Sequence, residues 1–303
     1  MKNVINRALA AKKKIFTLVV AAMTTISSFA WEYKNPGFEW SAGCEFTTAY
    51  LWRGMRYGGM AFQPDASVGY GGLSIEAWAN IGAKDNSFKN FNPELDVTLR
   101  YTIAGLTVGF THYYYFDKTK YFGYNKPLFS YDEAGNIERD EEGEILYERY
   151  NTCQGEVFAK FEFGEFFEKV PLTVMWSTYV AGDDWKVIEN EEDPNDVTLK
   201  RAFSSYLEVS YKAALPLGFS LTPTVGMTPW ASFYNNYENK FSVNNISLRA
   251  DWELNVKDIF TIDVYGIAML NTAGINKDNV WPSVKNSYAN QRLNLAAGVG
   301  IWF

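Results

Sequence analysis

The sequence predicts an all-β protein, a transmembrane antiparallel up-and-down β-barrel of about twelve strands. Three observations lead to this prediction. Segments of about ten residues alternate apolar and polar positions along most of the chain. Short connections between these segments alternate with long ones. Aromatic residues make up 17% of the chain although its mean hydropathy is −0.22, a mixture that suits a lipid-facing band around a polar lumen.

The first 30 residues have the three parts of a secretory signal peptide. Five basic residues and no acidic ones precede an apolar run at 15–26, and Ser28-Phe29-Ala30 offers a small-residue cleavage site. The apolar run has twelve residues, too few for a helix to cross about 30 Å of hydrocarbon. We therefore expect cleavage after Ala30, which leaves one barrel domain over residues 31–303.

The last eleven residues, 293–303, place apolar side chains at every second position and end on Phe303. This pattern is that of a strand with one apolar face and one face of mostly small or polar side chains. It resembles the C-terminal strand that bacterial outer-membrane barrels present to their insertion machinery. We therefore expect an outer-membrane location, with that machinery, membrane lipid and lipopolysaccharide as partners.

Eleven earlier segments show the same alternation. They cover residues 39–53, 62–70, 73–81, 94–103, 106–116, 150–163, 172–181, 203–214, 217–228, 241–254 and 259–269. Short connections fall near Gly71, Ala104, Phe167, Leu215 and Val256, and longer ones near Gly58, Asp85, 118–149, 182–201, Asn236 and Asn279. Short turns on one side of the membrane and long loops on the other are typical of outer-membrane barrels.

Alternation also predicts which side chains face the lumen. On the first segment Tyr50 and Trp52 fall on the lipid-facing side with Trp40, while Glu45 and Arg53 fall on the lumen side. Charged side chains avoid the lipid face, where one costs about 2–4 kcal/mol at the membrane midplane. The predicted lumen-lining residues are Glu45, Arg53, Glu76, Asp96, Arg100, Glu156, Lys160, Glu208, Lys212, Arg249, Asp251 and Arg292.

The segment Tyr50-Leu51-Trp52-Arg53-Gly54, followed by Gln63-Pro64, carries a family resemblance. Residues 44–82 resemble an uncharacterised family of bacterial outer-membrane β-barrels with a Tyr-x-Trp-Arg-Gly first strand, in its Bacteroides-type version. The resemblance implies a barrel in the outer membrane. It supplies no substrate and no catalytic residues.

Three functions are compatible with such a barrel. The favoured one is a narrow, porin-like passive channel for small polar solutes, whose lumen charges order water and select among solutes. The second is a closed barrel, filled by lumen ion pairs, whose acidic loops at 132–144 and 189–196 bind a partner protein or a glycan. The third is a lipid hydrolase that uses His112, the one histidine of the chain, with a nearby nucleophile.

The same residues argue against other classes of function. No nucleophile–base pair, nucleotide-binding loop or metal-ligand spacing is evident, so we predict no enzyme activity, no metal and no cofactor. Five of the 28 basic residues are lost with the signal peptide, which leaves 23 basic residues against 35 acidic ones. This excess of negative charge argues against binding to nucleic acid. Cys44 and Cys153 fall on non-adjacent strands, and we expect both to be free thiols.

Overall fold

The computed structural model describes residues 37–83, 91–116, 128–273 and 292–303, except residues 142, 144, 149–152, 168, 191, 194, 236 and 258. The expected signal peptide at 1–30 lies outside these residues, as do the loop centres near Asp85 and Asn279. Among the described residues, no helix has the length and apolarity needed to cross a membrane.

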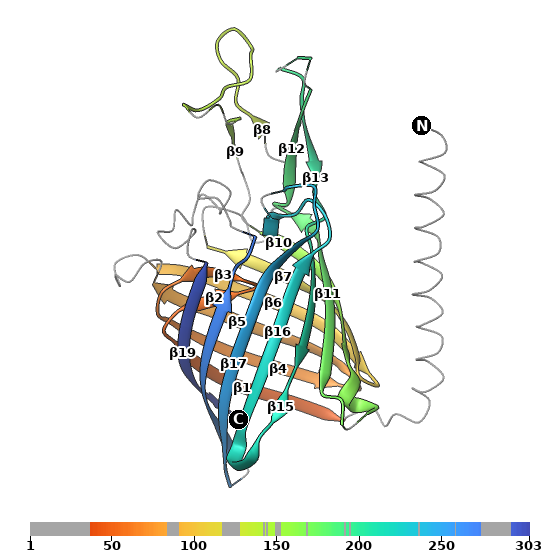
Figure 1. Ribbon diagram of the computed structural model, residues 1–303, viewed down its shortest axis with the longest axis vertical. Coiled ribbons are helices and arrows are strands. Elements are labelled where there is room, and N and C mark those ends of the chain that lie inside the picture. The colour runs from red at the N-terminus through yellow and green to blue at the C-terminus, as the bar shows by residue number, and fades with distance from the viewer. Residues whose placement is uncertain are drawn as a thin grey trace.

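Twelve antiparallel strands form a closed ring (Figure 1). In ring order they are β1 (Phe38–Thr47), β4 (Ala61–Tyr70), β5 (Leu73–Ala83), β6 (Phe91–Ile103), β7 (Leu106–Tyr115), β10 (Gln154–Glu162), β11 (Leu172–Gly182), β14 (Ser205–Tyr211) continued by β15 (Ala213–Ala214), β16 (Phe219–Thr228), β17 (Ser242–Val256), β18 (Phe260–Leu270) and β19 (Leu293–Trp302). The ring closes where β19 pairs with β1, Gly298–Trp302 lying opposite Gly43–Thr47.

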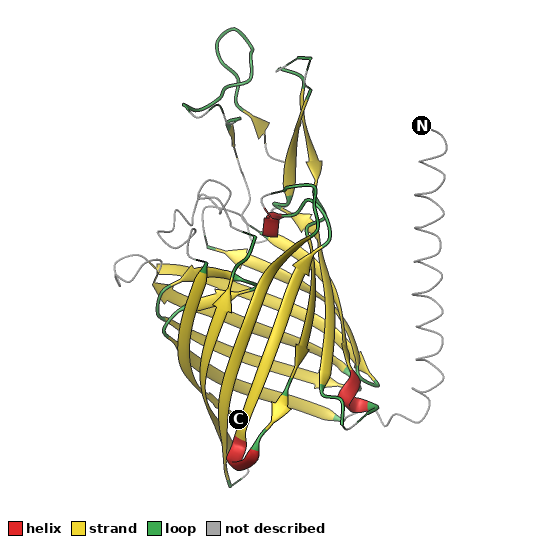
Figure 2. Ribbon diagram, viewed as in Figure 1, coloured by secondary structure: helices red, strands yellow, loops and turns green. Residues whose placement is uncertain are grey.

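Three further hairpins are not part of the ring of wall strands. The pair β2 (Tyr50–Trp52) and β3 (Met55–Gly58) follows β1, and the pairs β8 (Leu128–Phe129) with β9 (Tyr147–Glu148) and β12 (Trp185–Glu189) with β13 (Val197–Arg201) rise beyond one end of the barrel (Figure 1). Short 3-10 turns η2 (Phe163–Glu165) and η3 (Pro216–Gly218) join strands at the other end, and η4 (Phe233–Asn235) precedes β17 (Figure 2).

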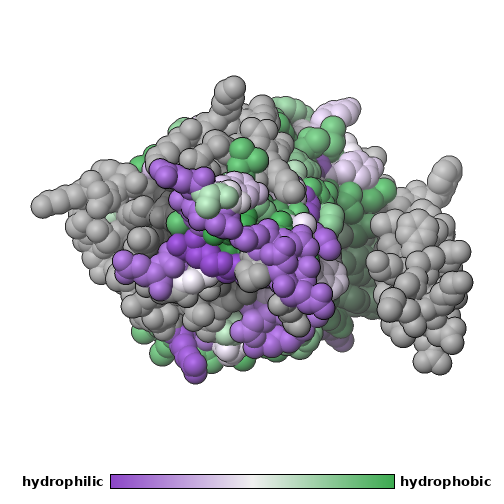
Figure 3. Space-filling model, turned by 90° about the horizontal axis from the view of Figure 1, so that it is seen from above, coloured by the Kyte–Doolittle hydropathy of each residue, from purple (hydrophilic) through white to green (hydrophobic). Residues whose placement is uncertain are grey.

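Each wall strand separates an apolar outer face from a polar inner face. Outward side chains on β5, β6 and β19 include Ile75, Leu99 and Leu295, exposed by 47%, 52% and 64%. Inward side chains pair with one another instead, as in the hydroxyl contact of Thr98 with Thr111 at 2.9 Å. Viewed from the long-loop end, polar residues gather on the loops above the barrel mouth and hydrophobic residues appear at its margin (Figure 3). A wall of this composition suits a lipid environment.

The predicted strands and connections agree with this ring, with one exception. Eleven of the predicted segments overlap one wall strand each, and the short connections near Gly71, Ala104, Phe167, Leu215 and Val256 all lie at one end of the barrel. The predicted antiparallel fold with about twelve strands is therefore confirmed. The exception is the segment 39–53, whose second half leaves the wall after β1 ends at Thr47.

Candidate functional site

A bend after β1 directs the chain into the lumen. Thr48 still bonds the neighbouring strand, its amide donating to the Ala297 carbonyl at 2.9 Å. The Thr47 hydroxyl donates to the Ala49 carbonyl at 2.9 Å, and the Ala49 amide donates to that hydroxyl at 3.4 Å. A threonine that bonds its own backbone two residues on stabilises a turn in place of an extended strand. The residues after Ala49 therefore enter the barrel.

These residues form the β2–β3 hairpin, and its tip is the Arg53-Gly54 dipeptide. Trp52 pairs with Met55 across the turn, and Arg53 and Gly54 have φ values of 47° and 88°. Two consecutive positive φ values are typical of the tight turn that connects hairpin strands. A Cβ at Gly54 would lie 2.2 Å from the Asn244 carbonyl oxygen on β17, so the tip fits against that strand only with glycine.

The Arg53 side chain joins the hairpin tip to the far wall. Its guanidinium donates to both carboxylate oxygens of Glu156, at 2.6 and 2.9 Å. Glu156 lies on β10, the fifth strand from β1 around the ring of twelve. Both side chains are buried, with 8% and 2% exposed. A bidentate pair of this kind is among the stronger polar contacts in proteins, and here it spans the lumen.

Aromatic groups surround this ion pair. The Tyr113 hydroxyl donates to Glu156 at 2.7 Å, and Arg53 donates to the Tyr234 hydroxyl at 2.5 Å. The Arg53 guanidinium carbon lies 4.3 Å from the ring centre of Trp52 and 4.8 Å from that of Tyr206. Such contacts stabilise a desolvated cation, which offsets part of the cost of burying the charge.

Tyr234 belongs to a second segment that folds inward, the loop before β17. The Asn235 side chain organises it: its amide donates to three carbonyls, those of Trp230, Glu238 and Lys240, at 3.0–3.1 Å. The Phe233 amide donates to the Ser204 hydroxyl at 2.8 Å, which ties the loop to the wall. The loop is therefore held in one conformation beside Arg53.

Residues 50–58 and 232–235 together form what we call the luminal plug. Its rings pack with inward tyrosines of the wall in one buried cluster, which comprises Tyr50, Met55, Tyr57, Tyr113, Tyr179, Tyr206, Phe233 and Tyr234. Tyr179, Tyr206 and Tyr234 are 0–1% exposed. The plug fills the lumen near its long-loop end with packed side chains.

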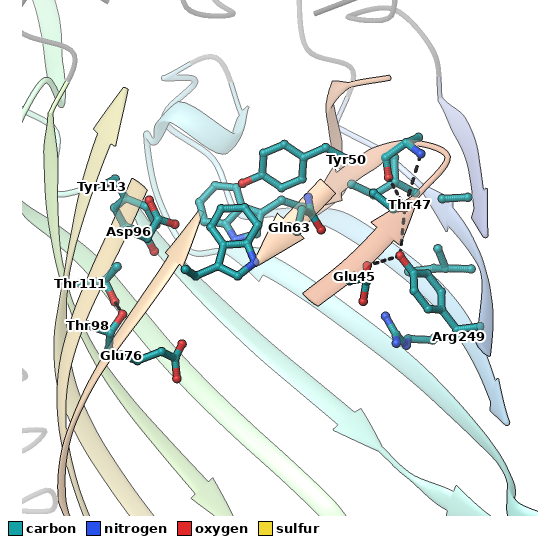
Figure 4. Close-up of a pocket in the computed structure, with 17 residues that line it drawn as sticks. Glu45, Thr47, Tyr50, Gln63, Glu76, Asp96, Thr98, Thr111, Tyr113 and Arg249 are labelled. Atoms are coloured by element: carbon teal, nitrogen blue, oxygen red, sulfur yellow. Dashed lines mark hydrogen bonds between the residues drawn. The ribbon is translucent and has the colours of Figure 1, made fainter. Parts of the chain in front are cut away.

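Beside the plug, the lumen contains a cavity of about 340 Å³. Its lining includes Tyr50 and Trp52 from the plug and polar or charged side chains from seven wall strands (Figure 4). These wall residues are Glu45, Thr47, Gln63, Glu76, Asp96, Thr98, Thr111, Tyr113, Arg249 and Tyr265. The interior is thus packed in one region and open in another.

Ion pairs organise the charges on the lumen face. Arg100 pairs with Glu76 at 2.6 Å, and Arg249 pairs with Asp251 and Asp263 at 2.5 and 3.0 Å. Acidic residues outnumber basic ones on the inner faces of the described strands. The acids include Glu45, Asp65, Glu76, Glu94, Asp96, Glu156, Glu208, Asp251 and Asp263, and the bases are Arg100, Lys160 and Arg249. A lumen of this sign attracts cations.

Most of the twelve predicted lumen residues lie on the inner face, but in separate groups. Glu45, Glu76, Asp96 and Arg249 line the cavity, and Arg100 and Asp251 pair with residues there. Arg53, Glu156 and Glu208 belong to the plug region, where Glu208 accepts from the Tyr206 hydroxyl at 2.9 Å. Lys160 pairs with Glu162 at 3.0 Å.

Two of the predicted residues lie at the ends of the barrel. Lys212 sits between β14 and β15 and pairs with Glu253 at 2.8 Å, both side chains being about half exposed. Arg292 precedes β19 and is exposed. Neither lies in the central lumen, because each falls where a wall strand is interrupted or has not begun.

The predicted orientation of Tyr50 and Trp52 was wrong. Both were expected on the lipid-facing side, and both lie inside the barrel because the chain bends at Thr47–Ala49. The alternating pattern of apolar and polar residues does not reveal a bend between two extended segments. The wall tyrosines Tyr113 and Tyr206 were not singled out, although each shares strand parity with a predicted lumen acid, Glu156 across β7–β10 and Glu208 on β14.

The residues directly opposite His112 on the neighbouring strands carry no nucleophilic side chain. His112 alternates with Thr111 and Tyr113, which face the cavity, so its parity is outward as predicted, yet it is only 4% exposed. Its cross-strand neighbours are Val97 and Gly155, and neither carries a nucleophilic group. Cys44 and Cys153, both among the described residues, form no disulfide, as predicted.

The two acidic loops contact each other above the barrel. The Gly135 amide donates to the Asp132 carbonyl at 3.0 Å, which places a turn at a hairpin tip. Arg139 pairs with Glu189 at 2.7 Å, and the Asn195 amide donates to the Asn136 side chain at 3.2 Å. The hairpins therefore form one projecting unit. No group of three or more potential metal ligands occurs among the described residues.

Comparison with known proteins gives similarity at the level of solved structures. No protein-family model matches the chain, and no curated protein matches it. Salmonella typhi OmpF in complex with daunomycin is 11% identical with a TM-score of 0.34, over 88% of this chain and 97% of that one. The CymD monoaromatic hydrocarbon channel is 10% identical with a TM-score of 0.35, over 92% and 90%. An outer-membrane channel from Pseudomonas putida F1 is 13% identical with a TM-score of 0.35, over 89% and 96%.

Proposed function

We propose that the chain is a narrow, porin-like channel in the outer membrane that admits small polar solutes and favours cations. The observation that carries this proposal is the cavity of about 340 Å³ inside a closed ring of strands, lined by charged and polar side chains. A barrel that served only as a membrane anchor would have no need of such a space. Twelve strands also enclose more room than the packed interior of an eight-stranded barrel.

The plug restricts this channel near the end that carries the long loops. Its packed aromatic cluster and the buried Arg53–Glu156 pair leave passage only beside the hairpin or after its displacement. Further parts of the proposal are that the long loops face the outside and that lipopolysaccharide surrounds the wall. Insertion through the strand ending at Phe303 and membership of the Tyr-x-Trp-Arg-Gly family also stay predictions.

Single-channel recording tests this function directly. We expect refolded residues 31–303 in a planar bilayer to give small discrete steps, and the reversal potential in a KCl gradient to show preference for potassium over chloride. The reason is the excess of acids on the lumen face. A variant with Asp96→Asn and Glu45→Gln should lower that preference. A silent bilayer, with folding shown by heat-modifiable gel mobility, would contradict the channel.

A closed barrel is the second candidate, and the plug is the observation that favours it. In that case the projecting unit of the two acidic hairpins, joined by Arg139 and Glu189, would bind a partner or a glycan. The same recording separates the two candidates, because a binding protein needs no conducting state. A lipid hydrolase is not favoured, since the groups opposite His112 are Val97 and Gly155.

The outward face leads to a prediction about membrane insertion. Leu99 lies on the outer face of β6. Replacing it with arginine should destabilise the protein folded in lipid vesicles, lowering its free energy of unfolding by about 2–4 kcal/mol. Leu217→Arg provides the matched control, because Leu217 is 86% exposed in the η3 turn at the barrel end, where the cost falls to about 0–1 kcal/mol. Urea titration in vesicles measures both, and equal losses would contradict a membrane-facing β6.

A further inference from the structure

The cavity beside the plug has the chemistry of a binding site for a small cation. Its lining contains three acids, Glu45, Glu76 and Asp96, and one base, Arg249. Arg249 is already engaged by Asp251 and Asp263, and Glu76 by Arg100. Glu45 and Asp96 are therefore the carboxylates of the lining that no ion pair within 4.0 Å neutralises among the described residues.

The oxygens of these two carboxylates differ in their partners. Glu45 accepts a hydrogen bond from the Tyr265 hydroxyl. The Asp96 carboxyl contacts that of Glu94, but its buried Oδ1 atom has no hydrogen-bond partner among the described groups. A buried polar atom without a partner is costly, so this oxygen is a place where a donor from a ligand would be stabilised. Figure 4 shows Asp96 beside Tyr113, with Tyr50 above and Glu45 across the cavity.

Aromatic rings form the rest of the wall. Tyr50, Trp52, Trp78, Tyr113 and Tyr265 all contribute to the lining. The lumen already holds cations of the chain in this manner: the Arg249 guanidinium carbon lies 3.7 Å from the Tyr265 ring centre and that of Arg53 lies 4.3 Å from the Trp52 ring centre. Carboxylates combined with aromatic faces are the recognised means of binding organic cations.

We infer that this cavity binds a small organic cation, an ammonium group on a compact organic body. Asp96 and Glu45 supply the opposite charge, and Trp78 and Tyr113 supply the aromatic faces. A cavity of about 340 Å³ is of the size of small-molecule sites. The inference rests on the proposed channel, and it names the class of solute that the channel would hold on its way through the lumen.

The test is calorimetric titration of the refolded protein, residues 31–303, with choline. The detergent should be a maltoside, because phosphocholine detergents carry the same headgroup as the probe. The neutral isostere 3,3-dimethyl-1-butanol has the shape of choline without its charge. We expect saturable binding of choline and no saturable binding of the isostere.

Variants then assign the binding to this cavity. Asp96→Asn and Glu45→Gln should each weaken choline binding by about tenfold or more, as expected for loss of a charged contact. Glu162→Gln is the control, an acid on the inner face of β10 that pairs with Lys160 outside the cavity lining. It should leave choline binding unchanged.

The outcomes separate this inference from the channel itself. Absence of saturable choline binding, equal binding of the isostere, or unchanged binding in both Asp96→Asn and Glu45→Gln would each overturn the inference, even if single-channel steps are observed. Binding that depends on Asp96 would support it even in a protein that gives no steps, because titration in detergent needs no conduction. Two variants are used so that one that fails to refold does not remove the test.

Discussion

Replacing Arg53 with glutamine should increase the single-channel conductance and the time spent in the larger conducting state. Loss of one partner from a buried ion pair costs about 3–5 kcal/mol, because the other charge stays buried without its counter-ion. That is about a hundredfold or more in the ratio of displaced to seated plug. Glu156→Gln removes the other half of the same pair and should have the same direction and a similar size.

The double variant Arg53→Gln with Glu156→Gln gives the sharper result. Two neutral amides can bond each other across the same gap, and neither leaves a buried charge. The double variant should therefore be less affected than either single variant, a coupling that a merely damaged barrel would not show. Arg139→Gln, in the exposed loop pair with Glu189, is the control and should conduct like the native protein.

One outcome would contradict a role of the Arg53–Glu156 pair in holding the plug. Arg53→Gln and Glu156→Gln would both refold, as judged by gel mobility, and both would keep the native conductance. In that case the tyrosine cluster alone would hold the hairpin, and displacement of the plug would depend on the contacts of η4.

Replacing Gly54 with alanine should also displace the hairpin, for a steric reason. The added Cβ would lie 2.2 Å from the Asn244 carbonyl oxygen, far inside contact distance, and neither partner is a flexible side chain. The tip must then move away from β17 and take Arg53 with it. We expect a larger conductance and a weaker near-UV circular dichroism signal, since the packed rings of the plug lose their fixed environment.

Gly135→Ala is the matched control for this change. Gly135 has a φ of 84°, close to the 88° of Gly54, so both variants carry the same left-handed strain, about 1–2 kcal/mol. A Cβ at Gly135 meets nothing within 4 Å. If both variants alter the conductance equally, the effect comes from backbone strain and the close fit of the tip against β17 is without consequence.

The ring of wall strands could be predicted from the sequence because one physical rule governs it. A strand between lipid and a polar lumen must alternate, and β5, with Leu73, Ile75 and Ile81 outward, follows that rule throughout. Turns such as Gly71-Gly72 mark where each strand ends. The lumen position of Glu76, Asp96 and Arg249 follows from the same parity.

The plug could not be predicted in this manner. Residues 50–53 continue the alternation of β1, so the start of a hairpin inside the lumen and an extension of the wall produce the same pattern. The difference lies in the Thr47 hydroxyl bonds to Ala49 and in contacts with residues far along the chain. The sequence also did not show where the Arg53-Gly54 turn would point, because its contacts with Glu156, Tyr206 and Tyr234 come from strands and a loop far along the chain.

The wide sequence separation of the plug contacts has a kinetic consequence. Arg53 lies 103 residues from Glu156 and 181 from Tyr234, whereas neighbouring wall strands such as β4 and β5 are joined by a two-residue turn. Contacts that close long loops form late, because the chain entropy of the loop is lost before the contact can stabilise the structure. The local wall hairpins are therefore expected to pair before the plug contacts form. The closing β1–β19 pair joins residues that are still farther apart in the sequence, Gly43–Thr47 with Gly298–Trp302, so closure of the ring and exclusion of water around Arg53 both belong to the late part of folding.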